Sequence, residues 1–150
     1  MNEATTNLAS RWKRLSGALI DGVLAMIVML PVMAVTGMFS ASLGSEGMTF
    51  GRRAGLFVLG CLVFLAMNGY LLFKRGQTIG KVAVKTKIVD LNGQLPDFGR
   101  LLALRYLVIA LVAQIPFLGG LIGLVNALFV FRSDRRCLHD HIAGTRVVEA

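Results

Sequence analysis

Two charged side chains stand at the start of the first long apolar run, in the stretch "KRLSGALIDGVLAMIVML". Arg14 and Asp21 are seven residues apart, which is two helical turns, so both project from one face with Cα atoms about 10.5 Å apart along the axis. Arginine is long enough to reach the membrane interface, whereas Asp21 lies about a third of the way into the apolar layer. A carboxylate at that depth must face the protein interior, a partner or water.

Two roles for Asp21 are compatible with this position. In the first, the partly desolvated carboxylate binds a proton or a cation, and competition among Arg14, the proton and the cation couples the movement of two ions. In the second, Asp21 and Arg14 form a buried ion pair that fixes the helix in place and moves nothing. Periodicity alone does not choose between them.

A second carboxylate, Asp140, lies between two histidines in "CLHDHIAGTRVV". His139 and His141 would point to one side only on an extended backbone, and no third ligand is in view, so we predict neither a metal site nor another cofactor. We favour Asp140 as a helix cap or ion-pair partner that docks the C-terminal segment against Arg14 or the basic loop. That contact would gather Arg14, Asp21 and Asp140 into one cluster.

Three amide side chains are further candidates. Asn68 is the only strongly polar residue of the second apolar run, and Gln114 and Asn126 lie on opposite sides of the break in the third. In a helical hairpin the last two could hydrogen-bond each other, for about 0.6 kcal/mol. Alternatively, all three line a cavity, because interrupted helices at membrane depth build ion sites in transporters.

The composition identifies the class of protein that must position these residues. Of the 150 residues, 55% are hydrophobic and 16% charged, whereas soluble domains carry about 25% charge. We therefore expect one membrane domain spanning residues 1–150. The net charge of +8 comes from basic residues beside the apolar runs, which indicates membrane topology rather than a nucleic-acid surface.

The first two apolar runs are long enough to cross a bilayer. Residues 15–38 would form a helix about 36 Å long, which exceeds a hydrocarbon core of about 30 Å and is too long for the core of a signal peptide. Residues 54–73 provide one further crossing. Small polar residues connect the two runs over positions 39–53.

The third apolar block, residues 101–131, would be about 46 Å long as one helix, but Pro116, Gly119 and Gly120 interrupt it. It is either a hairpin that returns to its starting side or an interfacial helix followed by one short crossing. The positive-inside rule puts both ends of the block and the N-terminus in the cytoplasm, so we favour the hairpin. The flanking basic residues are Lys74, Arg75, Lys81, Lys85, Lys87, Arg100, Arg132, Arg135 and Arg136.

Two short segments outside the apolar runs have strand character. Alternating side chains predict a strand over residues 84–90, followed by an Asn92-Gly93 turn, and residues 145–149 are its expected pairing partner. The nearby "GQTIGK" has three residues between its glycines where a phosphate-binding loop has four. We therefore predict no enzyme activity and expect Lys81 of this basic loop to meet anionic lipid head groups.

Three stretches in this order, "RLSGALID", "GQTIGKVAVKTKIVD" and "CLHDHIAGTRVV", resemble the RDD family of bacterial integral membrane proteins, named for one arginine and two aspartates. The resemblance covers residues from about 10 to 148. It implies that Arg14, Asp21 and Asp140 are the naming residues, and that transport of an unidentified ligand is the expected activity.

We therefore expect an all-α protein of the bacterial inner membrane, with a cytoplasmic N-terminus, two full transmembrane helices, a broken third block and a small cytoplasmic strand pair. The leading function is transport of a small solute, a cation coupled to protons. The alternative is a non-transporting scaffold or accessory subunit in which the charged cluster is structural. Because so small a chain has few inward faces to shelter Asp21, we also expect a homo-oligomer or a partner membrane subunit.

Overall fold

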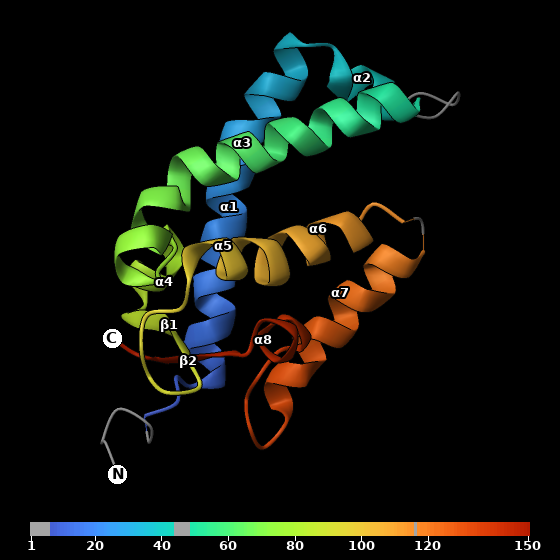
Figure 1. Cartoon of the computed structure of the whole chain (residues 1–150). Helices are drawn as coiled ribbons and strands as arrows, with labels where there is room; N and C mark the ends of the chain where they lie inside the picture. The colour runs from blue at the N-terminus through green and yellow to red at the C-terminus, as the bar shows by residue number, and fades with distance from the viewer. Residues whose placement is uncertain (1–6, 44–48, 116) are drawn as a thin grey trace.

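The computed structural model describes residues 7–43, 49–115 and 117–150. It is mostly helical, with two long apolar helices, a shorter apolar hairpin and one two-stranded antiparallel sheet (Figure 1). This is the expected fold class. The sheet, the start of α1 and the C-terminus gather at one end of the molecule, which we call the base.

The two long helices are α1 (Arg11–Val35) and α3 (Phe50–Arg75), and each is long and apolar enough to cross a membrane. Ser10 caps α1 by accepting a hydrogen bond from the Lys13 backbone N–H, and α3 ends at Gly76, whose positive φ closes the helix. None of the most apolar window of α1 is buried, and 11% of that of α3 is. These helices are therefore not the core of a soluble domain, because their apolar surface faces outward.

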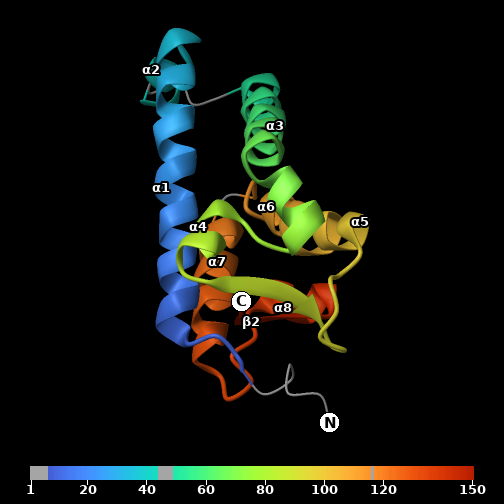
Figure 2. The same ribbon diagram turned by 90° about the vertical axis from the view of Figure 1, so that its left-hand side faces the viewer.

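A short helix lies where the sequence predicts only a polar connection. α1 ends at Val35, three residues before the expected end, and α2 (Met38–Leu43) follows after Gly37, which has a positive φ. The rest of the connection includes residues 44–48, which lie outside the described part of the chain. Beyond it, α3 returns beside α1 toward the base (Figure 2).

The third apolar block forms the expected helical hairpin. Its outgoing arm consists of α5 (Phe98–Arg100), the π-helical η2 (Leu101–Leu107) and α6 (Val108–Val112), and its returning arm consists of α7 (Leu118–Leu128) and the 3₁₀ turn η3 (Phe129–Phe131). The arms diverge from the chain reversal between α6 and α7 (Figure 1).

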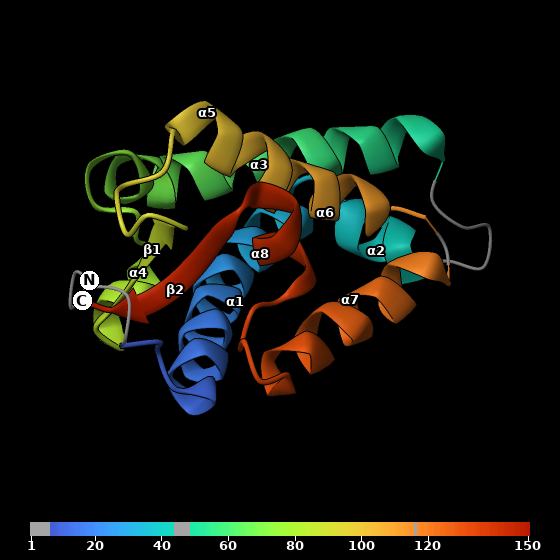
Figure 3. The same cartoon turned by 60° about the horizontal axis from the view of Figure 1, so that its bottom comes forward.

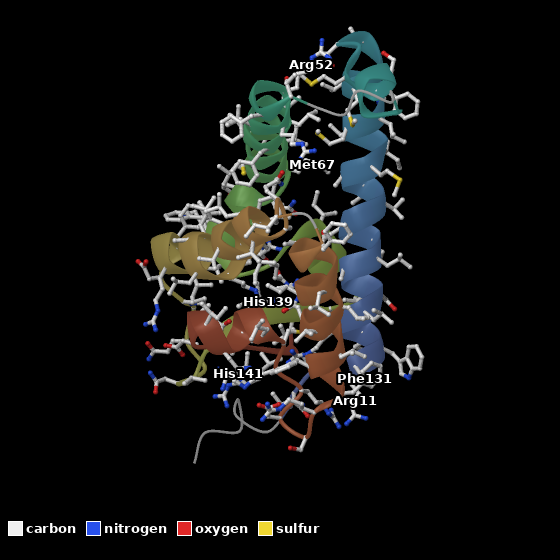
Figure 4. All side chains as sticks on the ribbon, turned by 90° about the vertical axis from the view of Figure 1, so that its right-hand side faces the viewer. Arg11, Arg52, Met67, Phe131, His139 and His141 are labelled. Carbon is white, nitrogen blue, oxygen red and sulfur yellow. The ribbon has the colours of Figure 1, made fainter. Side chains whose placement is uncertain are left out.

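Close backbone contact shapes this reversal. Phe117 adopts a positive φ, and a Cβ on Gly119 would lie only 2.4 Å from the Ala113 carbonyl oxygen. The expected break at Pro116 lies outside the described residues. The returning arm ends where α1 begins, because the Arg11 guanidinium lies 6.0 Å from the Phe131 ring centre (Figure 4).

The sheet pairs β1 (Thr86–Asp90) with β2 (Thr145–Glu149), with Ile88 opposite Val147. The pairing is the expected one, but β1 starts two residues later because the short helix α4 (Ile79–Ala83) precedes it. Ahead of α1, the Ala9 N–H donates to the Val147 carbonyl oxygen at 3.1 Å. The buried apolar core consists of Ala9, Leu72, Ile88, Leu101 and Val147.

The last helix, α8 (Leu138–Ala143), packs against η2 and α7 and leads into β2 through Gly144, which has a positive φ. Figure 3 shows β2 passing in front of α1, and α8 between the outgoing and returning arms of the hairpin. The base therefore brings together the start of α1, the start of the hairpin and the C-terminal segment.

Candidate functional site

Asp140 is the centre of a buried ion-pair network at the base. Its side chain is fully buried, and its two oxygens accept hydrogen bonds from two arginines, Arg14 at 3.2 Å and Arg105. Arg105 also donates to the Thr145 hydroxyl at 2.7 Å, and Arg14 to the Val147 carbonyl oxygen at 2.8 Å. These contacts join α1, η2, α8 and β2.

The position of Asp140 follows from its place in α8. It lies in the first helical turn and accepts a hydrogen bond from the Cys137 N–H at 3.1 Å, so it satisfies a free donor at the start of the helix. The carboxylate is thus both a cap and an ion-pair partner of Arg14, which combines two of the alternatives that the sequence left open.

Asp21 lies in a separate environment two turns further along α1. Its oxygens accept hydrogen bonds from the Thr78 hydroxyl at 2.5 Å and from the Gly80 N–H at 2.7 Å. Among the described residues it forms no ion pair. Of the two roles left open for Asp21, the ion pair with Arg14 is therefore not formed, and the three charged residues do not make the one cluster that we expected.

Helix α1, which carries Asp21, and helix α4, which donates a hydrogen bond to it, approach each other very closely. A Cβ on Gly80 would lie 2.1 Å from the Gly17 carbonyl oxygen, so only glycine lets α4 reach α1 at this point. Asn68 on α3 also holds α4 in place, because its side-chain oxygen accepts a hydrogen bond from the Ile79 N–H at 2.9 Å. Both long helices therefore contact α4 through hydrogen bonds.

A small cavity of about 140 Å³ opens beside Asp21, between α1 and α3. Asp21 and Asn68 are its polar residues. The rest of the lining is apolar and includes Met67 of α3, which Figure 4 labels. We call this space the Asp21 cavity.

A second cavity of about 160 Å³ lies at the base, and we call it the basic cavity. Its charged and polar lining residues include Arg14, Lys81, Arg105, Asn126, His139 and Asp140. His139 donates its backbone N–H to the Asn126 side-chain oxygen at 3.2 Å, and its ring Nδ1 lies 2.8 Å from the same oxygen. Because that oxygen only accepts, Nδ1 carries the ring proton.

The surroundings of His139 keep its ring neutral. Burial, and then the positive charges of Arg105, Lys81 and Arg14, lower its pKa to about 2. The ring nitrogen that lies 3.9 Å from Asp140 therefore belongs to an uncharged histidine and forms no salt bridge. Burial also raises the pKa of the Cys137 thiol, against the opposing pull of the same three cations.

The base does not favour a metal cation. Donor atoms of Cys137, His139 and Asp140 lie within 4.8 Å of one another, but two arginines already occupy the Asp140 oxygens. The positive charges of Arg105, Lys81 and Arg14, which add to burial in lowering the pKa of His139, would also repel a metal ion. His141 faces elsewhere, toward Asp134 at 2.9 Å, because α8 is a helix rather than a strand (Figure 4).

The three amides line three different cavities. Asn68 lies on the Asp21 cavity and Asn126 on the basic cavity, whereas Gln114 lies at a cavity of about 590 Å³ among apolar residues of α3, η2 and α6. Gln114 and Asn126 do not form the expected hydrogen bond. Gln114 is at the tip of the hairpin, whereas Asn126 is far down α7, where the diverging arms no longer face each other.

Sequence reasoning missed Arg105 as a site residue, together with the donors Thr78 and Gly80. A signal for Arg105 was present, since it is the only charged residue between positions 101 and 131 and ionisable residues in apolar segments mark sites by default. Thr78 and Gly80 lie in a stretch that the sequence alone presents as a polar loop, and no periodicity links them to Asp21.

Comparison with protein families identifies one family for this chain. The model of the RDD family matches residues 8–144. The chain is similar to a Bacillus subtilis (strain 168) protein named uncharacterized protein YckC, with 34% identity over 142 residues that cover 95% of this chain and 85% of that one. No solved structure gives a significant match.

Proposed function

Because the chain belongs to the RDD family of membrane proteins, we propose that it transports a small solute, exchanging a cation for protons, and that Asp21 is the exchanging group. The observation that carries this proposal is the isolated charge of Asp21. Both carboxylate oxygens receive hydrogen bonds from neutral donors only, and no basic side chain pairs with them among the described residues.

The Asp21 cavity provides the space that exchange requires. It places an unneutralised carboxylate at the end of an apolar space between two membrane-length helices. A proton and a cation compete for the oxygens of a carboxylate that has no basic partner. Competition at one group is sufficient to couple two opposite fluxes.

Asp140 has a different part in this proposal. Its charge is compensated by Arg14 and Arg105 inside the fold, so a bound cation would add little electrostatic stabilisation there. We assign the three residues to holding α1, the hairpin and the C-terminal segment together. Removing one partner of such a buried network costs about 3–5 kcal/mol.

The alternative function is that of a scaffold or accessory subunit without transport. It is favoured by the fact that the Asp21 hydrogen bonds also anchor α4 to α1. In either function we propose no enzyme activity and no nucleic-acid partner.

We also propose the surroundings in which the protein works. It lies in the bacterial inner membrane with a cytoplasmic N-terminus, contacts anionic lipid head groups through the basic loop, and associates with further copies or a partner subunit. The uncovered apolar length of α1 and the basic residues near the base support this arrangement.

Proton flux in proteoliposomes tests the exchange directly. We expect a pH-sensitive dye to report proton movement when Na⁺, K⁺ or Li⁺ is added to the wild-type protein, and Asp21→Asn to reduce it at least tenfold by removing the exchanging charge. Asp97→Asn is the matched control, because Asp97 is exposed and only caps α5. It should keep the flux.

Two results would contradict the proposal. Full flux from a folded Asp21→Asn protein would show that another group exchanges the ions. Absence of cation-dependent flux from correctly inserted wild-type protein would remove the mechanism and support the scaffold function.

A further inference from the structure

A second, chemically different site lies at the base of the fold. The basic cavity is separate from the Asp21 cavity, although consecutive residues of α4 contribute to the two sites: the Gly80 N–H binds Asp21, and Lys81 lines the basic cavity. The residues that line the basic cavity carry more positive charge than the carboxylate among them neutralises.

The charge balance of the cavity shows this excess. Arg14, Arg105 and Lys81 are positive, Asp140 is the one carboxylate among the lining residues, and His139 is neutral. Two positive charges are therefore uncompensated. Other nearby acids already have partners, since Asp134 contacts Arg132 and His141, and Glu149 contacts Lys13.

Unused hydrogen-bond donors accompany the uncompensated charge. The Arg14 side chain is 6% exposed, yet its buried Nε has no partner among the described residues. Lys81 is half-buried and has no carboxylate partner there either. Buried donors without partners cost about 1–3 kcal/mol each, so a fold that retains them is stabilised by an acceptor that enters.

From this cavity we infer that the protein binds a phosphate group at its base, held by Lys81, Arg14 and Arg105. A phosphate supplies several strong acceptor oxygens for the guanidinium groups and negative charge for the lysine. The volume of about 160 Å³ far exceeds the roughly 10–15 Å³ needed for one water.

The phosphate has two possible sources. Leu15 and Ala18 of α1 line the cavity and are exposed, so the opening lies beside the first turns of a membrane-length helix. A phospholipid head group can enter there from the side, and a free phosphate can enter from water. Both present the same chemistry, and the experiment separates them.

The free source is tested by thermal unfolding of the full chain in a nonionic detergent, titrated with inorganic phosphate against chloride at equal ionic strength. The lipid source is tested in nanodiscs of phosphatidylcholine with or without phosphatidic acid, with retained lipid counted by native mass spectrometry. We expect saturable binding in at least one arm.

Lys81→Gln is the main variant, because among the described residues Lys81 forms no ion pair whose loss would unfold the protein. It should weaken binding about tenfold or more, as expected for one charge-assisted hydrogen bond. Lys87→Gln is the matched control: Lys87 lies on β1, is exposed and does not line the cavity. It should bind as the wild type does. Ala18→Leu fills the opening without changing charge and should also weaken binding.

The outcomes are decisive in each arm. Phosphate binding that depends on Lys81 identifies a free phosphate, and retained phosphatidic acid that depends on Lys81 identifies a lipid head group. Equal binding by wild type, Lys81→Gln and Lys87→Gln would show general screening of surface charge and overturn the inference. Absence of binding in both arms would overturn it as well.

Discussion

At the scale of single residues, two aspartates of one chain have opposite surroundings. Asp140 is enclosed by Arg14 and Arg105, so its charge is used within the fold. Asp21 receives only neutral donors, so its charge remains available. His139 shows a related effect, because burial, and then the positive charges at the base, lower its pKa and keep its ring neutral.

The neutral state of His139 predicts a loss of stability in acid. Its folded-state pKa of about 2 lies below the value of about 6.5 in an unfolded chain. Below pH 6.5 the unfolded state therefore binds more protons than the folded state and is stabilised relative to it. Between pH 6.5 and 5.5 this one group should cost the fold about 1 kcal/mol, or about 2–4 °C of melting temperature.

Thermal unfolding in detergent at the two pH values measures this cost. His139→Gln should reduce the loss by that amount, and His141→Gln, which changes an exposed histidine facing Asp134, should not. An unchanged loss in His139→Gln would mean that the ring is already protonated in the folded protein.

At the scale of elements, two unusual segments position the site. The π-helical η2 carries Arg105 on its buried side, and π-helical turns often occur at functional positions. α4 has only five residues and is held by contacts from Asp21 and Asn68 rather than by its own length. Such a short helix depends on its neighbours for its place.

Gly80→Ala tests how α4 is positioned. The added Cβ would meet the Gly17 carbonyl oxygen and the Asp21 carboxylate, so α4 must move off α1. We expect a loss of about 1–3 kcal/mol in unfolding free energy, together with a loss of cation-dependent flux. Gly22→Ala on α1 is the control, since its Cβ would point into open space. Equal stability of the two variants would contradict the close approach seen here.

At the scale of the whole molecule, the first described residues, from Asn7 on, and the C-terminal segment lie together at the base. The sheet, the Ala9 contact with Val147 and the ion pair of Lys13 with Glu149 tie the C-terminal segment to the start of α1. Arg52, at the start of α3, lies at the opposite end of the molecule (Figure 4). If α1 and α3 both cross the membrane, we therefore expect the start of α1 and the C-terminal segment on one side of it.

This arrangement predicts the labelling pattern of single cysteines in intact cells. With Cys61 and Cys137 replaced by alanine, Thr49→Cys should react with a membrane-impermeant thiol reagent added outside, because Thr49 is exposed at the end opposite the base. Lys87→Cys, exposed at the base, should react only after the cells are opened. The reverse pattern would place the termini outside the cytoplasm and contradict the positive-inside expectation.

The sequence by itself determined the two membrane-length helices, the hairpin in the third block and the strand pair, and it offered Arg14 as one of two partners for Asp140. Length, hydrophobic runs, breaks and turn residues are local properties, and local properties set such elements. The tertiary structure alone decided that Arg14 turns away from Asp21, that Arg105 completes the ion network, and that Thr78 and Gly80 bind Asp21. Periodicity places a residue on a face of its own helix at a given depth, but the side chain that meets it comes from a distant segment, and only packing brings the two together.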